Sequence, residues 1–149
     1  MSTLTETPNR HSDALWTGNL KEGKGKVSLG SGVFSGTYSY DTRFAAGEGT
    51  TPEELLAAAH AACFTMATSG GLTKAGHPPE SLETRADVHM TTGASGPSID
   101  QIHLVIRGKV PGITASEFET VAGEAKKNCP MSKALAAVPT ITLEATLIT

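Results

Sequence analysis

The spacing of hydrophobic and polar positions is strand-like in the first part of the chain. Over residues 13–40, short β-prone runs are separated by glycines, which predicts a glycine-punctuated meander of strands. Residues 1–12 are mostly polar and predict a flexible N-terminal tail, while residues 13–149 are expected to form one domain. A loop is expected over residues 41–50.

The pattern becomes helical after residue 50. Residues 51–54 (Thr-Pro-Glu-Glu) place a hydroxyl, a proline and two acids in the order that starts a helix. Residues 55–73 contain no charged side chain, and apolar side chains cover the whole circumference of the predicted helix. Because a helix that is apolar all round is buried on every side, we expect a central or subunit-bridging helix. Its apolar run is shorter than a membrane span, and Gly70 and Gly71 are expected to weaken or end it.

The remaining elements follow from strand alternation and helical spacing. Two half-buried antiparallel strands, an amphipathic helix, a short helix and a final strand are expected in this order: residues 82–92, 99–110, 113–127, 129–137 and 139–148. Meander, long helix, two strands, two helices and strand make an α+β arrangement. We therefore expect antiparallel sheets around a buried central helix.

Composition restricts the possible partners. The net charge is −3 and the chain has only one Trp, two Tyr and four Phe, so it shows neither the basic surface nor the stacking aromatics of a nucleic-acid-binding protein. The N-terminal residues lack the apolar segment of a signal peptide. We expect no nucleic-acid partner, no membrane association and a cytoplasmic location.

Two cysteines are the candidate reactive groups. Cys63 and Cys129 are too far apart for a CxxC motif, and two inert, unrelated thiols remain an open interpretation. Cys129 precedes Pro130, so it is expected at a helix N-cap, where a thiolate is favoured. Cys63 lies inside an apolar helix, where burial raises its pKa unless a cation comes from elsewhere. Local chemistry alone therefore names Cys129 as the reactive thiol.

Longer segments around both cysteines carry a family resemblance. The stretch from Thr42 to Phe64, with Thr-Pro-Glu-Glu-Leu-Leu-Ala-Ala-Ala-His-Ala-Ala-Cys at its centre, resembles the signature of the OsmC/Ohr family of hydroperoxide reductases. The segment Asn-Cys-Pro-Met-Ser-Lys-Ala-Leu, which begins at Asn128, resembles the second cysteine motif of that family. The match extends from Trp16 to the final strand.

The resemblance implies a role for four residues. Cys63 matches the peroxidatic cysteine, Cys129 the resolving cysteine, Arg43 the cation beside the reactive thiol and Glu53 the carboxylate that holds the arginine. Cys63 would become a sulfenic acid and then form a disulfide with Cys129. A dithiol reductant, such as a lipoyl-bearing protein, would complete the cycle without metal, flavin or haem. The position of Arg43 just before the central helix resembles the OsmC branch.

Substrate and assembly follow from the same interpretation. Phe44, Phe64 and Met66 are predicted to contact the organic part of a hydroperoxide. Glu53 and Cys63 are ten residues apart on one predicted helix, which separates them by about 15 Å of axial rise. An arginine held by Glu53 could hardly reach Cys63 of the same chain. We therefore expect a homodimer with shared active sites, and the resemblance also implies an intertwined dimer.

Two other function classes remain open. One is a binding protein without turnover, in which an apolar pocket holds a ligand and the cysteines are structural. The other is a cysteine hydrolase, for which His60, one turn before Cys63, is the candidate base. No acidic residue nearby is available to orient this imidazole, which favours a packed histidine. Consumption of peroxide with dithiothreitol as donor distinguishes a peroxidase from both.

Overall fold

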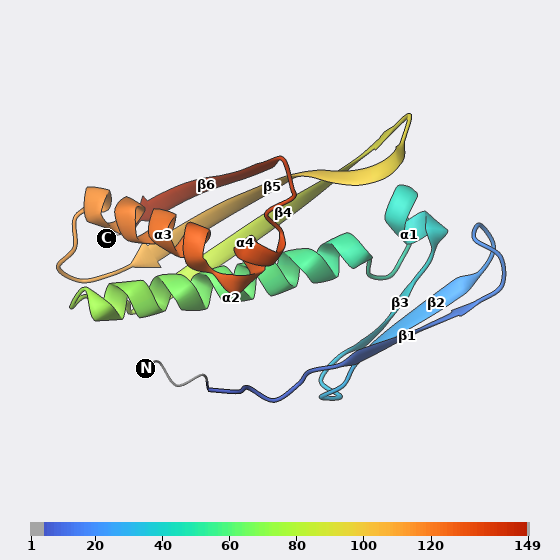
Figure 1. The fold of residues 1–149 in the computed structure, drawn as a ribbon, viewed down its shortest axis with the longest axis horizontal. Coiled ribbons are helices and arrows are strands. Elements are labelled where there is room, and N and C mark those ends of the chain that lie inside the picture. Colours follow the sequence, from blue (N-terminus) through green and yellow to red (C-terminus); the bar gives the residue numbers. More distant parts are fainter. Residues whose placement is uncertain (1–4, 149) are drawn as a thin grey trace. The chain divides into compact units, whose positions relative to one another are not determined.

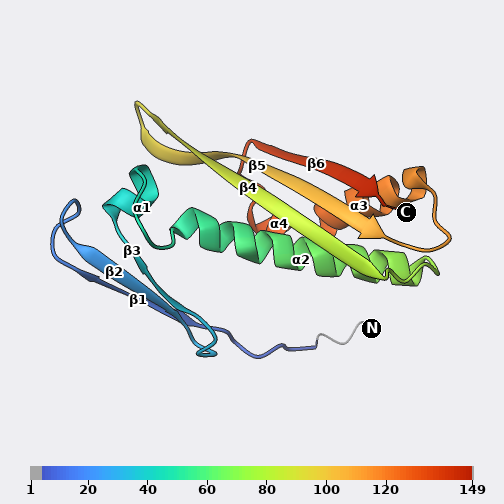
Figure 2. The same ribbon diagram turned by 180° about the vertical axis from the view of Figure 1, so that it is seen from behind.

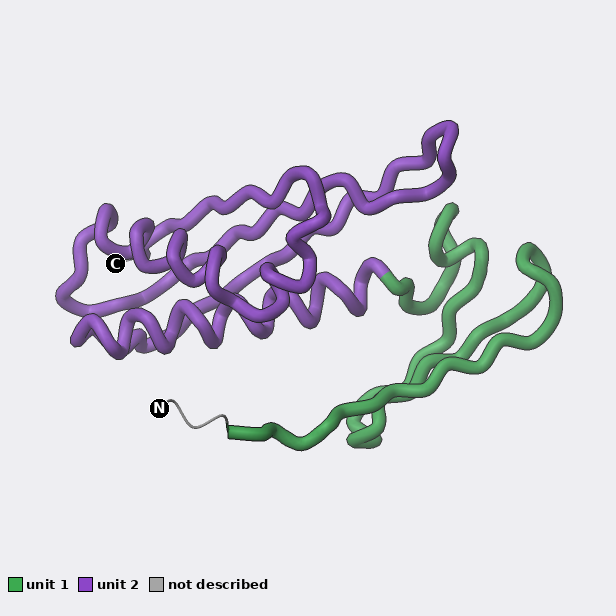
Figure 3. Tube along the Cα trace, viewed as in Figure 1, with its two compact units in different colours: residues 1–52 green, residues 53–149 purple. Residues whose placement is uncertain are grey.

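A computed structural model describes residues 5–148 of the chain. The chain divides into two compact units, residues 1–52 and residues 53–149, and each is described by itself (Figure 3). The single domain expected over residues 13–149 stays a prediction. The first part of the expected N-terminal tail, residues 1–4, lies outside the described residues.

The first unit is built on the expected meander of strands. Its three strands pair antiparallel in sequence order: β1 (Ser12–Thr17), β2 (Lys24–Leu29) and β3 (Ser35–Tyr38). Gly25 lies opposite Tyr38, and a Cβ at this glycine would lie within 2.8 Å of the rings of both Tyr38 and Trp16. The glycine therefore lets these two rings, with centroids 5.5 Å apart, lie against the sheet.

The segment expected to be a loop contains a short helix, α1 (Tyr40–Phe44). Ser39 and Thr42 form a capping box, in which the Ser39 amide donates to Thr42 Oγ1 at 2.9 Å and the Thr42 amide donates to Ser39 Oγ at 3.2 Å. The prediction of an unbroken loop over residues 41–50 was wrong, because a five-residue helix is too short to leave a hydrophobic period in the sequence. The helix places Arg43 in its last turn.

The second unit contains a three-stranded sheet with the order β4–β5–β6 (Figure 1). Its strands are β4 (Ser81–Gly93), β5 (Gly96–Lys109) and β6 (Thr140–Leu147). β4 and β5 pair antiparallel as expected, whereas β6 runs parallel to β5. The expectation of purely antiparallel sheets was therefore wrong for β6. Two helices, α3 (Ala115–Asn128) and α4 (Pro130–Ala134), connect β5 to β6, and such a helical crossover returns the chain in the same direction.

The helices of the second unit cover one face of this sheet. The long helix α2 (Pro52–Lys74), α3 and α4 lie on the same side of β4, β5 and β6 in both views (Figures 1 and 2). Ile102, Leu104 and Ile106 of β5 point into this layer and are fully buried, while Gln101 and Arg107 are exposed. The core is therefore enclosed between the sheet and the helices.

The α2 helix is buried along one stripe only. His60, Phe64, Thr68 and Leu72, spaced four residues apart, are fully buried against the core. Other faces of the helix remain partly or wholly exposed in the single chain, and Met66 is 76% exposed. The expectation of a helix buried on every side is therefore wrong for one chain by itself, and an uncharged face is left without cover.

The α2 helix is also longer than expected. It has 23 residues and a mean hydropathy of 1.3 over its most apolar 18-residue window, so length and composition alone would allow it to cross a membrane. The expectation of a run too short for a span was therefore wrong. A core helix that is mostly buried can have the same length and composition, whereas α2 is buried in the single chain only along the stripe described above.

Gly70 and Gly71 do not end α2, which continues to Lys74, and the expectation that they weaken the helix stays a prediction. A Cβ at Gly71 would lie 2.9 Å from Val121 Cγ1 of α3, so glycine at this position lets the two helices approach closely. The helix ends where Gly76 adopts a φ of +90°. There the His77 amide donates to the Leu72 carbonyl at 2.8 Å, as in a Schellman motif.

Candidate active site

The structure brings the two cysteines into contact. Cys63 lies near the middle of α2, and Cys129 lies between α3 and α4. Their Sγ atoms are 3.2 Å apart and both thiols are free. This separation is about 1 Å longer than a disulfide bond. The two thiols are therefore neighbours in the fold, although the cysteines are 66 residues apart in sequence.

Cys129 occupies the N-cap position of α4, as expected. Its amide donates to the Ala125 carbonyl at 2.9 Å at the end of α3, and Pro130 is the first residue of α4. The sulfur makes no formal N-cap hydrogen bond. Burial raises the pKa of Cys129, but the amide of Ser132, the Cys63 thiol, the Ser132 hydroxyl and the Met131 amide together outweigh burial and lower the pKa below its usual value.

Cys63 shows the opposite shift. Burial raises the pKa of Cys63, the Met131 amide opposes this effect, and the adjacent Cys129 raises the pKa further. Within residues 53–148, no cationic side chain lowers this pKa. Of the two thiols in this unit, Cys129 is therefore the more readily ionised, and a positive charge close to Cys63 would favour its thiolate.

His60 is a packed histidine with a defined partner. Its side chain is fully buried, and its Nε2 lies 2.8 Å from Ser132 Oγ. Burial lowers the pKa of His60 and keeps the ring neutral. The imidazole therefore pairs with Ser132. A hydrolase would need this imidazole as a base for Cys63, so the pairing disfavours the hydrolase hypothesis. Sequence reasoning missed Ser132, although its place three residues after a predicted N-cap was a usable signal.

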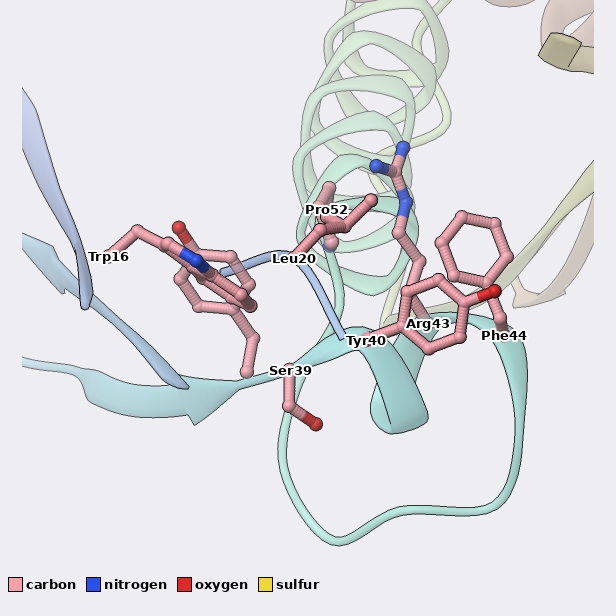
Figure 4. A pocket seen from close by; sticks show the side chains of 8 residues that line it. Trp16, Leu20, Ser39, Tyr40, Arg43, Phe44 and Pro52 are labelled. Carbon is pink, nitrogen blue, oxygen red and sulfur yellow. The ribbon is translucent and has the colours of Figure 1, made fainter. Parts of the chain in front are cut away.

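Arg43 belongs to the first unit, at the end of α1. Its guanidinium carbon lies 5.6 Å from the centroid of the Phe44 ring, and the rings of Tyr40 and Phe44 are 4.8 Å apart (Figure 4). A mainly apolar pocket of about 210 Å³ opens beside them, lined by Trp16, Leu20, Tyr38, Ser39, Tyr40, Arg43, Phe44 and Pro52. Arg43 therefore lines a pocket that is suited to an apolar group.

The other predicted residues occupy distinct positions. Glu53 lies in the first turn of α2, and the uninterrupted helix confirms that about 15 Å of axial rise separates it from Cys63. Phe64 is fully buried in the core, whereas Met66 is on the exposed face of α2. Among residues 5–148, His, Cys, Asp and Glu side chains form no group of three or more that could hold a metal ion.

Comparison with known proteins identifies the family. The family model described as OsmC-like protein matches residues 45–144, which include both cysteines. The chain belongs to the OsmC-like family. It is 45% identical to the peroxiredoxin OsmC of Escherichia coli (strain K12) over 136 residues, covering 91% of this chain and 95% of that protein. It is 34% identical to the organic hydroperoxide resistance protein of Xanthomonas axonopodis pv. citri over 93 residues, covering 60% and 62%.

Solved structures of OsmC-like proteins share the fold. The OsmC-like protein from Mycoplasma pneumoniae aligns with a TM-score of 0.74 at 18% identity, covering 97% of this chain and 100% of that chain. The organic hydroperoxide resistance protein from Elizabethkingia anophelis aligns with a TM-score of 0.70 at 25% identity, covering 99% and 98%. The expected α+β class and OsmC-like fold are thereby confirmed, and the higher identity to OsmC than to the Xanthomonas protein agrees with the expected branch.

Proposed function

We propose that this OsmC-like protein is a thiol-dependent peroxidase that reduces organic hydroperoxides to alcohols with Cys63 and Cys129. The contact between two free thiols with opposite pKa shifts is the observation that carries the proposal. Relatives named as a peroxiredoxin and as an organic hydroperoxide resistance protein support the same chemistry.

The reaction has two steps in this chain. The Cys63 thiolate attacks one oxygen of the peroxide, so that an S–O bond forms, the O–O bond breaks and the alkoxide leaves as the alcohol after taking up a proton. Cys63 is then a sulfenic acid. The Cys129 thiolate attacks its sulfur, hydroxide leaves, and a Cys63–Cys129 disulfide forms. An external dithiol, as a small molecule or on a lipoyl-bearing protein, restores both thiols.

Arg43 and Glu53 of a second copy complete the site in this proposal. Cys63 has a raised pKa in its own unit, so its ionisation requires a cation. Glu53 lies too far along α2 to present an arginine to Cys63 of the same helix. A partner chain removes this conflict, because its Arg43 and Glu53 would approach Cys63 from outside and would also stabilise the leaving oxygen.

The uncovered face of α2 offers the surface for this second copy. Ala59, Ala62, Met66 and Gly70 are exposed, and their spacing of three and four residues places them on one face of the helix. These side chains are uncharged and mostly small, so another α2 helix could approach closely. A homodimer packed along this stripe would provide the burial that the apolar circumference of α2 requires.

The pocket of the first unit would hold the organic part of the substrate. It is mainly apolar, it contains Arg43 at its rim and Phe44 in its wall, and its volume of about 210 Å³ admits a small alkyl or aryl group. The predicted contacts of Phe64 and Met66 with substrate stay predictions. In this chain the first is part of the core and the second is exposed.

A peroxide-consumption assay tests the proposed function. The protein is mixed with cumene hydroperoxide and dithiothreitol, and the remaining peroxide is measured against time. We expect catalytic consumption by the wild type and none by Cys63→Ser above the rate of dithiothreitol alone. A wild-type protein that consumes no peroxide while binding an apolar probe would instead establish the ligand-binding alternative.

A further inference from the structure

A buried polar pair lies behind the two thiols. His60 is 0% exposed and Ser132 is 8% exposed, yet the core around them is apolar. Burying two polar side chains costs free energy unless they are hydrogen-bonded, and the 2.8 Å contact between Nε2 and Oγ gives each side chain one hydrogen bond, while Nδ1 of His60 has no partner. His60 lies one turn before Cys63 in α2, and Ser132 lies three residues after Cys129. Each member of the pair is therefore one turn from one of the sulfurs.

The directions of these hydrogen bonds can be assigned. A serine hydroxyl has one hydrogen to donate, whereas a thiolate can only accept. If Ser132 donates to Cys129, its oxygen must accept from His60, so Nε2 carries the hydrogen of the neutral imidazole. Nδ1 is then a bare lone pair, and among residues 5–148 it is the buried side-chain nitrogen or oxygen without a partner. In this tautomer the buried atom without a partner is an acceptor. The other tautomer would leave the Nδ1–H donor without a partner, which costs more free energy.

We propose that His60 and Ser132 are positioning residues for the disulfide-forming step: the imidazole orients the Ser132 hydroxyl, which stabilises the Cys129 thiolate facing Cys63. The inference rests on the roles proposed above for the two cysteines. The favourable effect of the Ser132 hydroxyl on ionisation of Cys129 agrees with this direction of donation. In this proposal neither residue acts in the first step, because Ser132 lies one turn from Cys129 and favours the ionisation of that thiol.

In this proposal the His60–Ser132 pair protects Cys63 from overoxidation. In the second step the Cys129 thiolate forms an S–S bond with the sulfenic sulfur of Cys63, the S–O bond breaks, and hydroxide leaves and takes up a proton from solvent. If this step is slow, a second peroxide can oxidise the sulfenic acid to a sulfinic acid, which the disulfide cycle does not recover. Loss of the hydroxyl at residue 132 should therefore make Cys63 more sensitive to excess peroxide.

Rapid-quench mass spectrometry separates the two steps. Reduced full-length protein is mixed with cumene hydroperoxide, and the thiol, sulfenic acid, disulfide and sulfinic acid forms of Cys63 are counted against time. In Ser132→Ala we expect the rate of thiol loss to stay unchanged. Disulfide formation should become slower by about tenfold, because the free energy of one hydrogen bond to a charged group corresponds to a rate change of about this factor. His60→Leu should show a smaller loss, because the Ser132 hydroxyl can still donate.

Two further variants distinguish positioning from packing. Ser132→Thr keeps the hydroxyl and is expected to retain most of the disulfide rate. Thr68→Val removes another buried hydroxyl of α2, one that bonds the Phe64 carbonyl at 2.9 Å, and should leave both steps unchanged.

The outcomes separate this inference from the proposed function. Wild-type disulfide kinetics in Ser132→Ala, or an equal slowing of both steps, would overturn the positioning role alone. Slowing of the second step by Thr68→Val as well would show a general packing effect and would also overturn it. A wild-type protein that forms no Cys63–Cys129 disulfide would overturn the proposed function and this inference together.

Discussion

At the scale of single residues, the proposed peroxide reduction uses two thiols whose pKa values are shifted in opposite directions. Cys129 is held near backbone amides and the Ser132 hydroxyl, and its pKa is lowered. Cys63 has a raised pKa in the same unit. In the proposed reaction, a resolving Cys129 that ionises more readily would shorten the lifetime of the sulfenic acid, while the attacking Cys63 would depend on a cation from elsewhere.

The first prediction concerns that cation. Arg43→Ala should raise the pKa of Cys63 by about one to three units, the effect of an opposite charge at close range. The thiolate fraction at neutral pH then falls, so thiol oxidation slows and its pH profile moves to higher pH. Alkylation rates against pH in a Cys129→Ser background measure the pKa of Cys63 directly.

Arg85→Ala is the matched control for this prediction. Arg85 is an exposed arginine that pairs with Asp87 at 2.8 Å on the sheet, so its loss should leave the pKa of Cys63 unchanged. An Arg43→Ala protein with the same Cys63 pKa as its parent would remove the proposed role of the arginine.

At the scale of elements, the sequence predicted most of the architecture because the long strands and α3 have a clear period and α2 has a clear start signal and an uncharged run. The alternation of β4 and β5 and the capping of α3 by Thr114 and Glu117 are local signals, and the structure confirms the elements they predict. The α1 helix was missed because five residues carry no period. The parallel pairing of β6 depends on how the crossover packs, and that information is not local.

Gly71 shows why a helix-weakening residue can lie inside a helix. A Cβ at Gly71 would lie 2.9 Å from Val121 Cγ1, so a larger side chain would require Val121 to shift, and close packing here offsets the low helix propensity of glycine. Gly71→Leu should destabilise the protein by about 1–3 kcal/mol through overpacking. Gly123→Ala of α3, where a Cβ meets nothing within 4 Å, should instead be neutral or stabilise by up to about 1 kcal/mol. Urea unfolding of both at one protein concentration measures the difference.

The pocket beside α1 leads to a prediction about substrates. Burial of an alkyl or aryl group there should contribute about 1.5–3 kcal/mol, which favours organic peroxides over hydrogen peroxide by roughly ten- to a hundredfold. The ratio of kcat/KM for cumene hydroperoxide and hydrogen peroxide measures this preference. Equal values for the two peroxides would show that the pocket takes no part in substrate selection.

At the scale of the whole molecule, two features of the single chain bear on its assembly: one uncovered helix face and the raised pKa of Cys63. The uncharged face of α2 is exposed, and no cationic side chain among residues 53–148 lowers the pKa of Cys63. The proposed homodimer with shared sites would account for both features. The residues of the site were identified in sequence by family resemblance, because the contact between Cys63 and Cys129 is formed by tertiary packing. Ser132 lies in the second motif, but the resemblance assigned it no role, and its contact with His60 is formed by tertiary packing.

Subunit complementation tests the shared site. Cys63→Ser chains lack the attacking thiol, and Glu53→Ala chains are expected to be impaired in presenting Arg43. If the sites are shared, a mixed dimer has one site with neither lesion and one with both, so co-refolding should recover activity that neither parent shows. Each parent refolded alone is the control. If Arg43, Glu53 and Cys63 act within one chain, every site keeps one lesion and no activity returns.

The central claim is that Cys63 attacks the peroxide and Cys129 resolves the product. Mass spectrometry of reduced protein after about one equivalent of cumene hydroperoxide tests it most directly. The wild type should yield a Cys63–Cys129 disulfide, Cys129→Ser should stop with a sulfenic acid on Cys63, and Cys63→Ser should leave the peroxide unreduced. Rapid oxidation of Cys129 in Cys63→Ser, together with no reaction in Cys129→Ser, would contradict the account and reverse the roles of the two thiols.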